Sequence, residues 1–165
     1  MTAKKVSSPA ALPEPGNKAP AFALPAHTGD TIRLADLAGG PVVVYFYPKD
    51  NASGCTIEAQ EFRDLAPKFK KAGVTVFGIS PDSVKSHCGF ADKQKLNFAL
   101  LADEDHAVAE RFGVWVQKSM YGRKYMGIQR ATFLIDGAGK IAKVWPKVTP
   151  KGHAAEVLAA ATALK

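Results

Sequence analysis

The sequence contains only two cysteines, Cys55 and Cys88. Two cysteines are too few for the disulfide framework of a small secreted domain. The chain has no Cys-x-x-Cys pair of the kind that dithiol oxidoreductases use, and its four histidines are too widely spread to give zinc-ligand spacing with the cysteines. We therefore expect no metal site, and we expect any bridge between the two thiols to be transient and catalytic.

Long apolar runs are also missing. No uninterrupted run approaches the roughly 18 to 20 residues that a membrane-spanning helix needs. The opening segment MTAKKVSSPAALPEPG has lysines but no apolar stretch behind them, so neither a membrane span nor a secretory signal is expected. We expect a cytoplasmic protein, in a compartment where free thiols are kept reduced.

Phosphate-binding loops of the Gly-x-Gly-x-x-Gly and Walker types are absent, so no nucleotide cofactor is predicted. The formal net charge of +7 comes from 22 basic and 15 acidic residues. The basic residues are scattered, and the chain shows neither an arginine-rich arm nor a nucleic-acid-binding motif. A solvated basic surface is therefore favoured over a nucleic-acid partner.

The 165 residues suit one domain with a flexible tail. Residues 1–18 are rich in proline, alanine, serine and lysine and form the predicted tail. Residues 19–165 form the predicted domain, with an initial hairpin and short helical turn over 19–37. Buried strands are then expected at 41–48, 74–80 and 98–103, helices at 55–72, 82–95, 106–113 and 151–165, a connection with strand character at 114–129, and a hairpin at 130–145. This order predicts an α/β protein with a mixed central sheet and helices on both faces.

The segment YPKDNASGCTIEAQEFRD places Cys55 at the start of the first long helix. The first N–H groups of a helix and its positive dipole end favour a thiolate at this position. Gly54 lets the backbone come close to whatever approaches the sulfur, and Pro48 ends the preceding strand, so both are candidate substrate-binding residues. From its position alone, Cys55 is equally expected to be a nucleophile or a small buried hydrophobic residue.

The segment YFYPKDNASGCTIEAQEFRD resembles the active-site segment of peroxiredoxins of the bacterioferritin comigratory protein (BCP) or PrxQ group. GISPDSVKSHCGF and MYGRKYMGIQRATFLID also match that group in order and spacing. The resemblance implies a thioredoxin-like fold, reduction of hydrogen peroxide and organic hydroperoxides, Cys55 as the peroxidatic cysteine and Arg130 as the active-site arginine. Arginine suits this task because its guanidinium offers a permanent fork of donors to the sulfur and the peroxide. Glu58 is expected only to complement the helix dipole.

The chain departs from this group at Ala52, where the pattern has threonine or serine three residues before the cysteine. The hydroxyl that contacts the peroxide in the group is therefore missing. Losing one hydrogen bond to a charged group costs about 1.5 to 3 kcal/mol, so we expect a slower enzyme unless Ser53, Thr56 or a water replaces that hydroxyl.

Cys88 is the only candidate within the chain to capture an oxidised Cys55. It lies one helical turn before the usual position of the group, which here is Ala91, so an intramolecular Cys55–Cys88 disulfide should need unwinding of both helix starts. Three alternatives stay open: a one-cysteine peroxidase resolved by an external thiol, a thioredoxin-like disulfide oxidoreductase, and a weakened redox sensor or binding module. The resemblance further implies a monomer that thioredoxin or a similar dithiol protein recycles.

Overall fold

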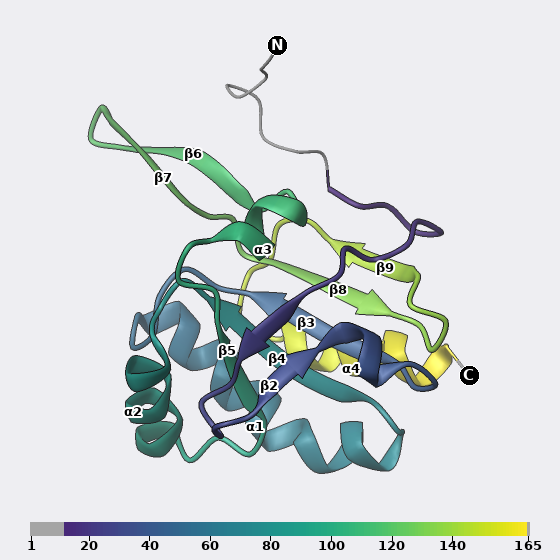
Figure 1. Ribbon diagram of the computed structural model, residues 1–165. Coiled ribbons are helices and arrows are strands. Elements are labelled where there is room, and N and C mark those ends of the chain that lie inside the picture. Colours follow the sequence, from purple (N-terminus) through teal and green to yellow (C-terminus); the bar gives the residue numbers. More distant parts are fainter. Residues whose placement is uncertain (1–11, 165) are drawn as a thin grey trace.

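The computed structural model describes residues 12–164, in which one five-stranded mixed sheet is covered on both faces (Figure 1). The strand order is β5-β4-β3-β8-β9, with these bounds: β3, Val42–Phe46; β4, Thr75–Ser80; β5, Ala99–Ala102; β8, Ala131–Ile135; β9, Ile141–Trp145. β3 pairs in parallel with β4, and β4 pairs in parallel with β5, whereas β8 is antiparallel to both β3 and β9. The predicted α/β class and mixed sheet are confirmed.

Every residue of β3 is buried, as the apolar run at 41–48 predicts for a central strand. Alternate side chains point to opposite faces, so Val43 and Tyr45 pack with the helices of one layer, while Val44 and Phe46 pack into the other core cluster. The strand therefore joins two separate hydrophobic cores, one on each face of the sheet.

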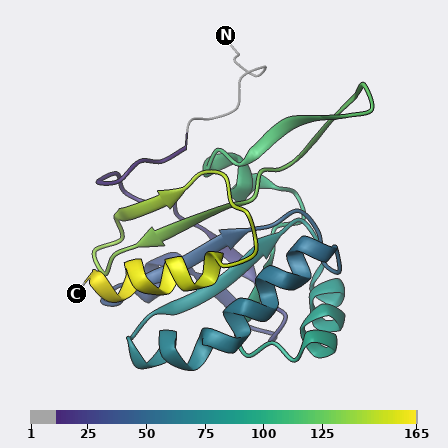
Figure 2. The same cartoon turned by 180° about the vertical axis from the view of Figure 1, so that it is seen from behind.

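One face of the sheet carries the three longest helices, α1 (Ser53–Lys71), α2 (Val84–Gln94) and α4 (His153–Ala163), which Figure 2 shows from that side. The opposite face is covered by the hairpin of β1 (Ala23–Pro25) and β2 (Thr31–Arg33), the short 3-10 helix η1 (Leu34–Leu37) and α3 (Ala107–Arg111). Among residues 12–164, no helix has both the length and the apolar character needed to cross a bilayer.

The connection predicted at 114–129 is a separate two-stranded ribbon, made of β6 (Trp115–Met120) and β7 (Arg123–Ile128). Tyr121 and Gly122 turn the ribbon with φ angles of 52° and 79°, the left-handed conformation that two-residue hairpin turns require. Figures 1 and 2 both show the ribbon projecting from the body of the molecule.

The predicted tail falls mostly on residues 1–11, which lie outside the described residues. Near the predicted boundary, the backbone N–H of Gly16 donates to the carbonyl of Ile141, and the N–H of Ile141 donates to the carbonyl of Asn17. Contacts with the sheet edge therefore begin before residue 19, and the division into a tail and a domain at residue 18 stays a prediction.

Candidate active site

Strand pairing brings Arg130 next to Cys55. Phe46 at the end of β3 lies opposite Ala131 at the start of β8, so the residue before β8 stands beside the segment that leads from β3 into α1. Nη2 of Arg130 donates to Sγ of Cys55 at 3.3 Å, although the two residues are 75 positions apart in the sequence. This contact joins the two residues that the resemblance assigns to the chemistry.

Cys55 is the third residue of α1 and is only 1% exposed. At this position its sulfur is close to the unpaired N–H groups and the positive dipole end of the helix. Lys118 on β6 adds a second cation, since the charges of Arg130 and Cys55 both act on it. Burial and the charge of Arg130 lower the pKa of Lys118. Two cations and the helix N-terminus therefore act on the sulfur.

Glu58 holds the guanidinium from the opposite side. Its Oε1 accepts a hydrogen bond from Nη1 of Arg130 at 2.7 Å, one helical turn after Cys55. Burial would lower the pKa of Arg130, but the negative charges of Glu58 and Cys55 outweigh it and raise that pKa. The arginine thus uses one nitrogen for the carboxylate and the other for the sulfur. From the sequence, Glu58 is expected only to complement the helix dipole, and its i, i+3 spacing from Cys55 is the one local signal that the two side chains share a helix face.

Burial raises the pKa of Glu58 to about 7, against the lowering effect of Arg130. Its Oε2 is buried and has no hydrogen-bond partner among the described residues. Between about pH 4.5 and 7 the folded chain keeps a proton on Glu58 that the unfolded chain loses, so the free energy of unfolding should fall as the pH rises through this window.

Glu58→Gln should remove this pH dependence. A shift of one pKa unit corresponds to about 1.4 kcal/mol. As the pH rises from 4.5 to 8, the free energy of unfolding of the variant should therefore increase by on the order of 3 kcal/mol relative to that of the wild type. Urea denaturation of both proteins across that range measures the difference. Asp64→Asn, an exposed carboxyl on the same helix, is the control. If the difference in free energy of unfolding between Glu58→Gln and the wild type did not change with pH, the raised pKa of Glu58 would be contradicted.

Gly54 makes room for the arginine. A Cβ atom at this position would lie 3.2 Å from Nη2 of Arg130 and 3.4 Å from Cγ of Pro150. The missing side chain therefore allows the guanidinium to reach the sulfur, which is a different use of this glycine from the predicted close approach of substrate. Pro48 lies half-buried just after β3, in the loop that leads to the helix.

Ala52 is the N-cap of α1 and, having no hydroxyl, gives the helix no side-chain cap. The hydroxyl of Thr56 donates to the carbonyl oxygen of Ala52 at 2.9 Å, so its proton is already used. Among the described residues, the hydrogen bond from Arg130 is the only one recorded for Sγ of Cys55. Among residues 12–164, no side-chain hydroxyl therefore forms a hydrogen bond to the sulfur in place of the threonine of the PrxQ pattern.

Cys88 lies in the first half of α2 and is exposed, and no disulfide joins it to Cys55. Its thiol donates to the carbonyl oxygen of His27, in the turn between β1 and β2, at 3.3 Å. Ala91, the usual position in the PrxQ group, is by contrast buried. The structure thus brings Cys55, Gly54 and Arg130 together, whereas Cys88 is exposed and contacts the turn between β1 and β2.

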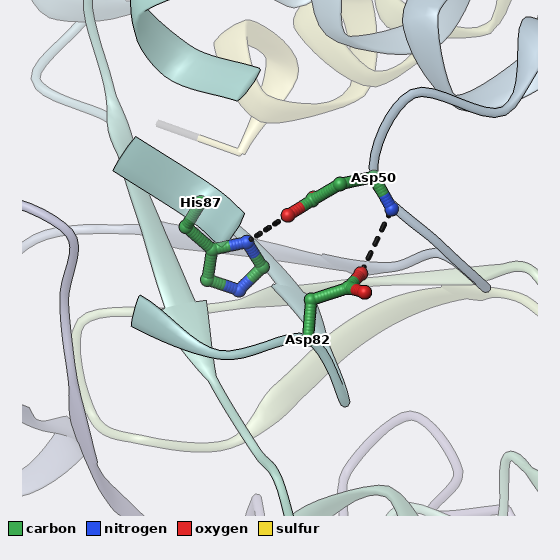
Figure 3. A group of neighbouring side chains, drawn as sticks. All are labelled: Asp50, Asp82 and His87. Atoms are coloured by element: carbon green, nitrogen blue, oxygen red, sulfur yellow. Dashed lines mark hydrogen bonds and ion pairs between the residues drawn. The ribbon is translucent and has the colours of Figure 1, made fainter. Parts of the chain in front are cut away.

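One further cluster of titratable side chains lies beside this site. Ligand atoms of Asp50, Asp82 and His87 all fall within 4.8 Å of one another (Figure 3). Their oxygens already accept hydrogen bonds from protein donors, which include the hydroxyls of Tyr47 and Ser80. We interpret the cluster as a hydrogen-bond network, because a metal ion would have to displace these donors.

Comparisons with known proteins identify the family. Residues 15–144 match the AhpC/TSA family. The chain is 49% identical over 138 residues to peroxiredoxin Bcp of Escherichia coli, covering 84% of this chain and 88% of that protein, and 47% identical over 145 residues to peroxiredoxin Bcp of Bacillus subtilis, covering 88% and 92%.

Solved structures agree with the sequence comparison. The bacterioferritin comigratory protein of Xanthomonas campestris superposes with a TM-score of 0.83 at 43% identity, over 87% of this chain and 91% of that one. Peroxidoxin BcpB of Mycobacterium tuberculosis gives a TM-score of 0.81 at 35% identity, over 93% and 99%. The predicted thioredoxin-like fold and the resemblance are therefore confirmed: the chain belongs to the AhpC/TSA family and is a peroxiredoxin of the Bcp/PrxQ group.

Proposed function

We propose that Cys55 is the nucleophile of this thiol peroxidase. The hydrogen bond between Sγ of Cys55 and Arg130 is the observation that carries the proposal. The thiolate attacks one oxygen of the hydroperoxide, an S–O bond forms, and the O–O bond breaks. The departing oxygen takes the electron pair and a proton and leaves as water or an alcohol, while Cys55 becomes a sulfenic acid. Arg130 and the helix N–H groups stabilise the charge that spreads from the sulfur to the two oxygens.

The second-order rate constant for oxidation of Cys55 by hydrogen peroxide tests this assignment. We expect it to exceed that of a free cysteine, because the site holds a cation and a helix N-terminus against the sulfur. A rate constant no larger than that of a free thiol would rule out Cys55 as the nucleophile of a peroxidase. The related Xanthomonas campestris protein is described as reducing alkyl peroxides, so cumene hydroperoxide should be compared with hydrogen peroxide.

We propose that Cys88 resolves the sulfenic acid. Its thiol attacks the Cys55 sulfur, the S–S bond forms, and the hydroxyl leaves with the thiol proton as water. The exposure of Cys88 supports a thiol that can move. Its thiol contacts the His27 carbonyl and is not bonded to Cys55, so we propose that both helix starts unwind locally to bring the two Cα atoms within the roughly 7 Å that a disulfide needs.

Mass spectrometry after one equivalent of peroxide tests the resolving step. The wild-type protein should lose two hydrogens, whereas Cys88→Ser should carry a sulfenic acid or a mixed adduct on Cys55, because it has no second thiol. Sulfenic acid or an external adduct in the wild type would favour the one-cysteine alternative. Oxidation without turnover in the presence of a dithiol reductant would favour a redox sensor, for which Ala52 is the supporting feature.

We further propose a monomeric, cytoplasmic enzyme whose disulfide is reduced by thioredoxin or a similar dithiol protein. An exposed Cys88 supports this route, because a protein thiolate can attack only a sulfur that it can reach. Peroxide-dependent oxidation of a thioredoxin system measures the turnover. Reduction of insulin without peroxide turnover would instead support the disulfide oxidoreductase.

A further inference from the structure

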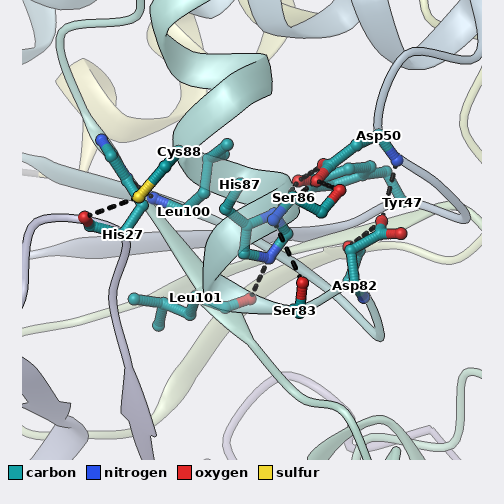
Figure 4. Close-up of polar contacts among 11 residues, drawn as sticks. His27, Tyr47, Asp50, Asp82, Ser83, Ser86, His87, Cys88, Leu100 and Leu101 are labelled. Atoms are coloured by element: carbon teal, nitrogen blue, oxygen red, sulfur yellow. Dashed lines mark hydrogen bonds and ion pairs between the residues drawn. The ribbon is translucent and has the colours of Figure 1, made fainter.

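A buried carboxylate fixes the loop that leads to Cys55. Asp50 lies between β3 and α1 and is 3% exposed. Its Oδ1 accepts a hydrogen bond from the Tyr47 hydroxyl at 2.7 Å, and its Oδ2 accepts from the Ser86 hydroxyl at 2.7 Å and lies 2.8 Å from Nδ1 of His87 (Figure 4). Burial would raise the pKa of Asp50, but these hydrogen bonds outweigh it and lower that pKa, so the group is a carboxylate.

His87 connects this carboxylate to the sheet. Its fully buried ring has Nδ1 against Asp50 and Nε2 at 2.9 Å from the carbonyl oxygen of Leu101 on β5. Both ring nitrogens therefore face hydrogen-bond acceptors, the Asp50 carboxylate and the Leu101 carbonyl oxygen. The imidazole of His87 thereby connects the loop before α1, the helix α2 and the strand β5.

A second anchor lies next to the first. The backbone N–H of Asp50 donates to Oδ2 of Asp82 at 2.8 Å, and the Ser80 hydroxyl donates to the same oxygen at 2.7 Å. Asp82 stands just before Ser83, whose hydroxyl oxygen caps α2 by accepting from the N–H of Ser86. The loop before α1 is therefore attached both to the N-terminal turn of α2 and to the residues before it (Figures 3 and 4).

The two ends of this network adjoin the two cysteines. The loop that Asp50 anchors ends at Ala52, the N-cap of the helix that carries Cys55. His87 is the residue before Cys88, whose thiol points to the His27 carbonyl. The local unwinding of both helix starts that we propose for the Cys55–Cys88 disulfide would break the hydrogen bonds between Asp50 and its partners Ser86 and His87.

We propose that Asp50 and His87 are positioning residues, which form a latch between the loop at 48–52 and the first turns of α2, and that the opening of this latch sets how fast the Cys55 sulfenic acid meets Cys88. The proposal rests on the proposed function of Cys88. Two reactions compete for the sulfenic acid: attack by the Cys88 thiol gives the disulfide and water, and a second hydrogen peroxide gives the sulfinic acid and water. A tighter latch favours the second reaction.

Ser86→Ala and Asp50→Asn test the latch. Ser86→Ala removes one donor and leaves a carboxylate with two others, so it should fold even where Asp50→Asn does not. At a fixed peroxide concentration we expect about a tenfold to 100-fold smaller ratio of sulfinic acid to disulfide in both variants, because the loss of one hydrogen bond to a charged group changes an opening equilibrium by roughly this factor. Ser86→Thr keeps the hydroxyl and should restore the wild-type ratio.

Asp103→Asn is the matched control. Asp103 is another buried carboxylate at a helix start, but it accepts from the N–H groups of Val108 and Ala109 in α3. The variant Asp103→Asn should leave the ratio of sulfinic acid to disulfide unchanged. An equal effect of Asp103→Asn and Asp50→Asn would show general destabilisation and would overturn the latch, as would an unchanged ratio in both latch variants.

A second measurement separates the latch from the role of Cys88. In a Cys88→Ser background, iodoacetamide should alkylate the buried Cys55 about tenfold or more faster when Ser86→Ala is added, because the loop opens more often. Faster alkylation together with a wild-type protein that forms no disulfide would reject Cys88 as the resolving thiol while supporting the latch. Unchanged alkylation would overturn the latch itself.

Discussion

Replacing Arg130 by lysine should slow the oxidation of Cys55 by hydrogen peroxide about 100-fold to 1,000-fold, the usual cost of losing one aligned donor to a developing charge. Lysine keeps the positive charge but offers a single ammonium, which cannot serve both the Cys55 sulfur and the Glu58 carboxylate in the geometry seen here. The rate constant, measured by stopped-flow fluorescence or by competition, reports this step before any disulfide forms.

Two further variants make the Arg130 result specific. Arg130→Met removes the charge as well and should be slower than Arg130→Lys, since it also leaves Glu58 buried without its partner. Arg123→Lys, on the projecting ribbon, should keep the wild-type rate constant because Arg123 is exposed and outside the site. If Arg130→Lys oxidised as fast as the wild type, the paired hydrogen bonds of the guanidinium would have no part in the reaction.

Replacing Ala52 by threonine should speed the oxidation of Cys55 roughly tenfold to 100-fold. A threonine at this N-cap has a hydroxyl oxygen that can accept from an unpaired N–H in the first turn of α1 and a proton that it can donate beside the sulfur. A hydrogen bond to a charged group is worth about 1.5 to 3 kcal/mol, which gives the expected factor. The added cap should also raise the free energy of unfolding by about 1 kcal/mol.

Ala52→Val is the matched control, because valine has nearly the shape of threonine without the hydroxyl. It should neither speed the reaction nor cap the helix, since it has no polar atom to offer. The second-order rate constant and a urea denaturation curve, measured for both variants, separate the chemical effect from the stabilisation of the helix. An unchanged rate in Ala52→Thr would mean that a hydroxyl at this position does not contribute to the reaction.

The sequence by itself determined the order of the elements and the position of Cys55 within them. The apolar run before Pro48 and the charge order along residues 55–72 are local patterns, and local patterns are enough to specify a buried strand and an amphipathic helix. They placed Cys55 at a helix start correctly. The identity of Arg130 as its partner came from the resemblance, because no local pattern connects residues so far apart in the chain.

Only the tertiary structure decided how the side chains around Cys55 are used. The register of β3 against β8 brings Arg130 to the sulfur, and Glu58 takes its role from that arrangement. The turn of α2 directs Cys88 towards His27 and His87 towards Asp50. The physical reason is that hydrogen bonds and burial depend on distances between segments that fold together from distant parts of the chain. A spacing of residues along one helix contains no information on which strand or loop that helix will meet.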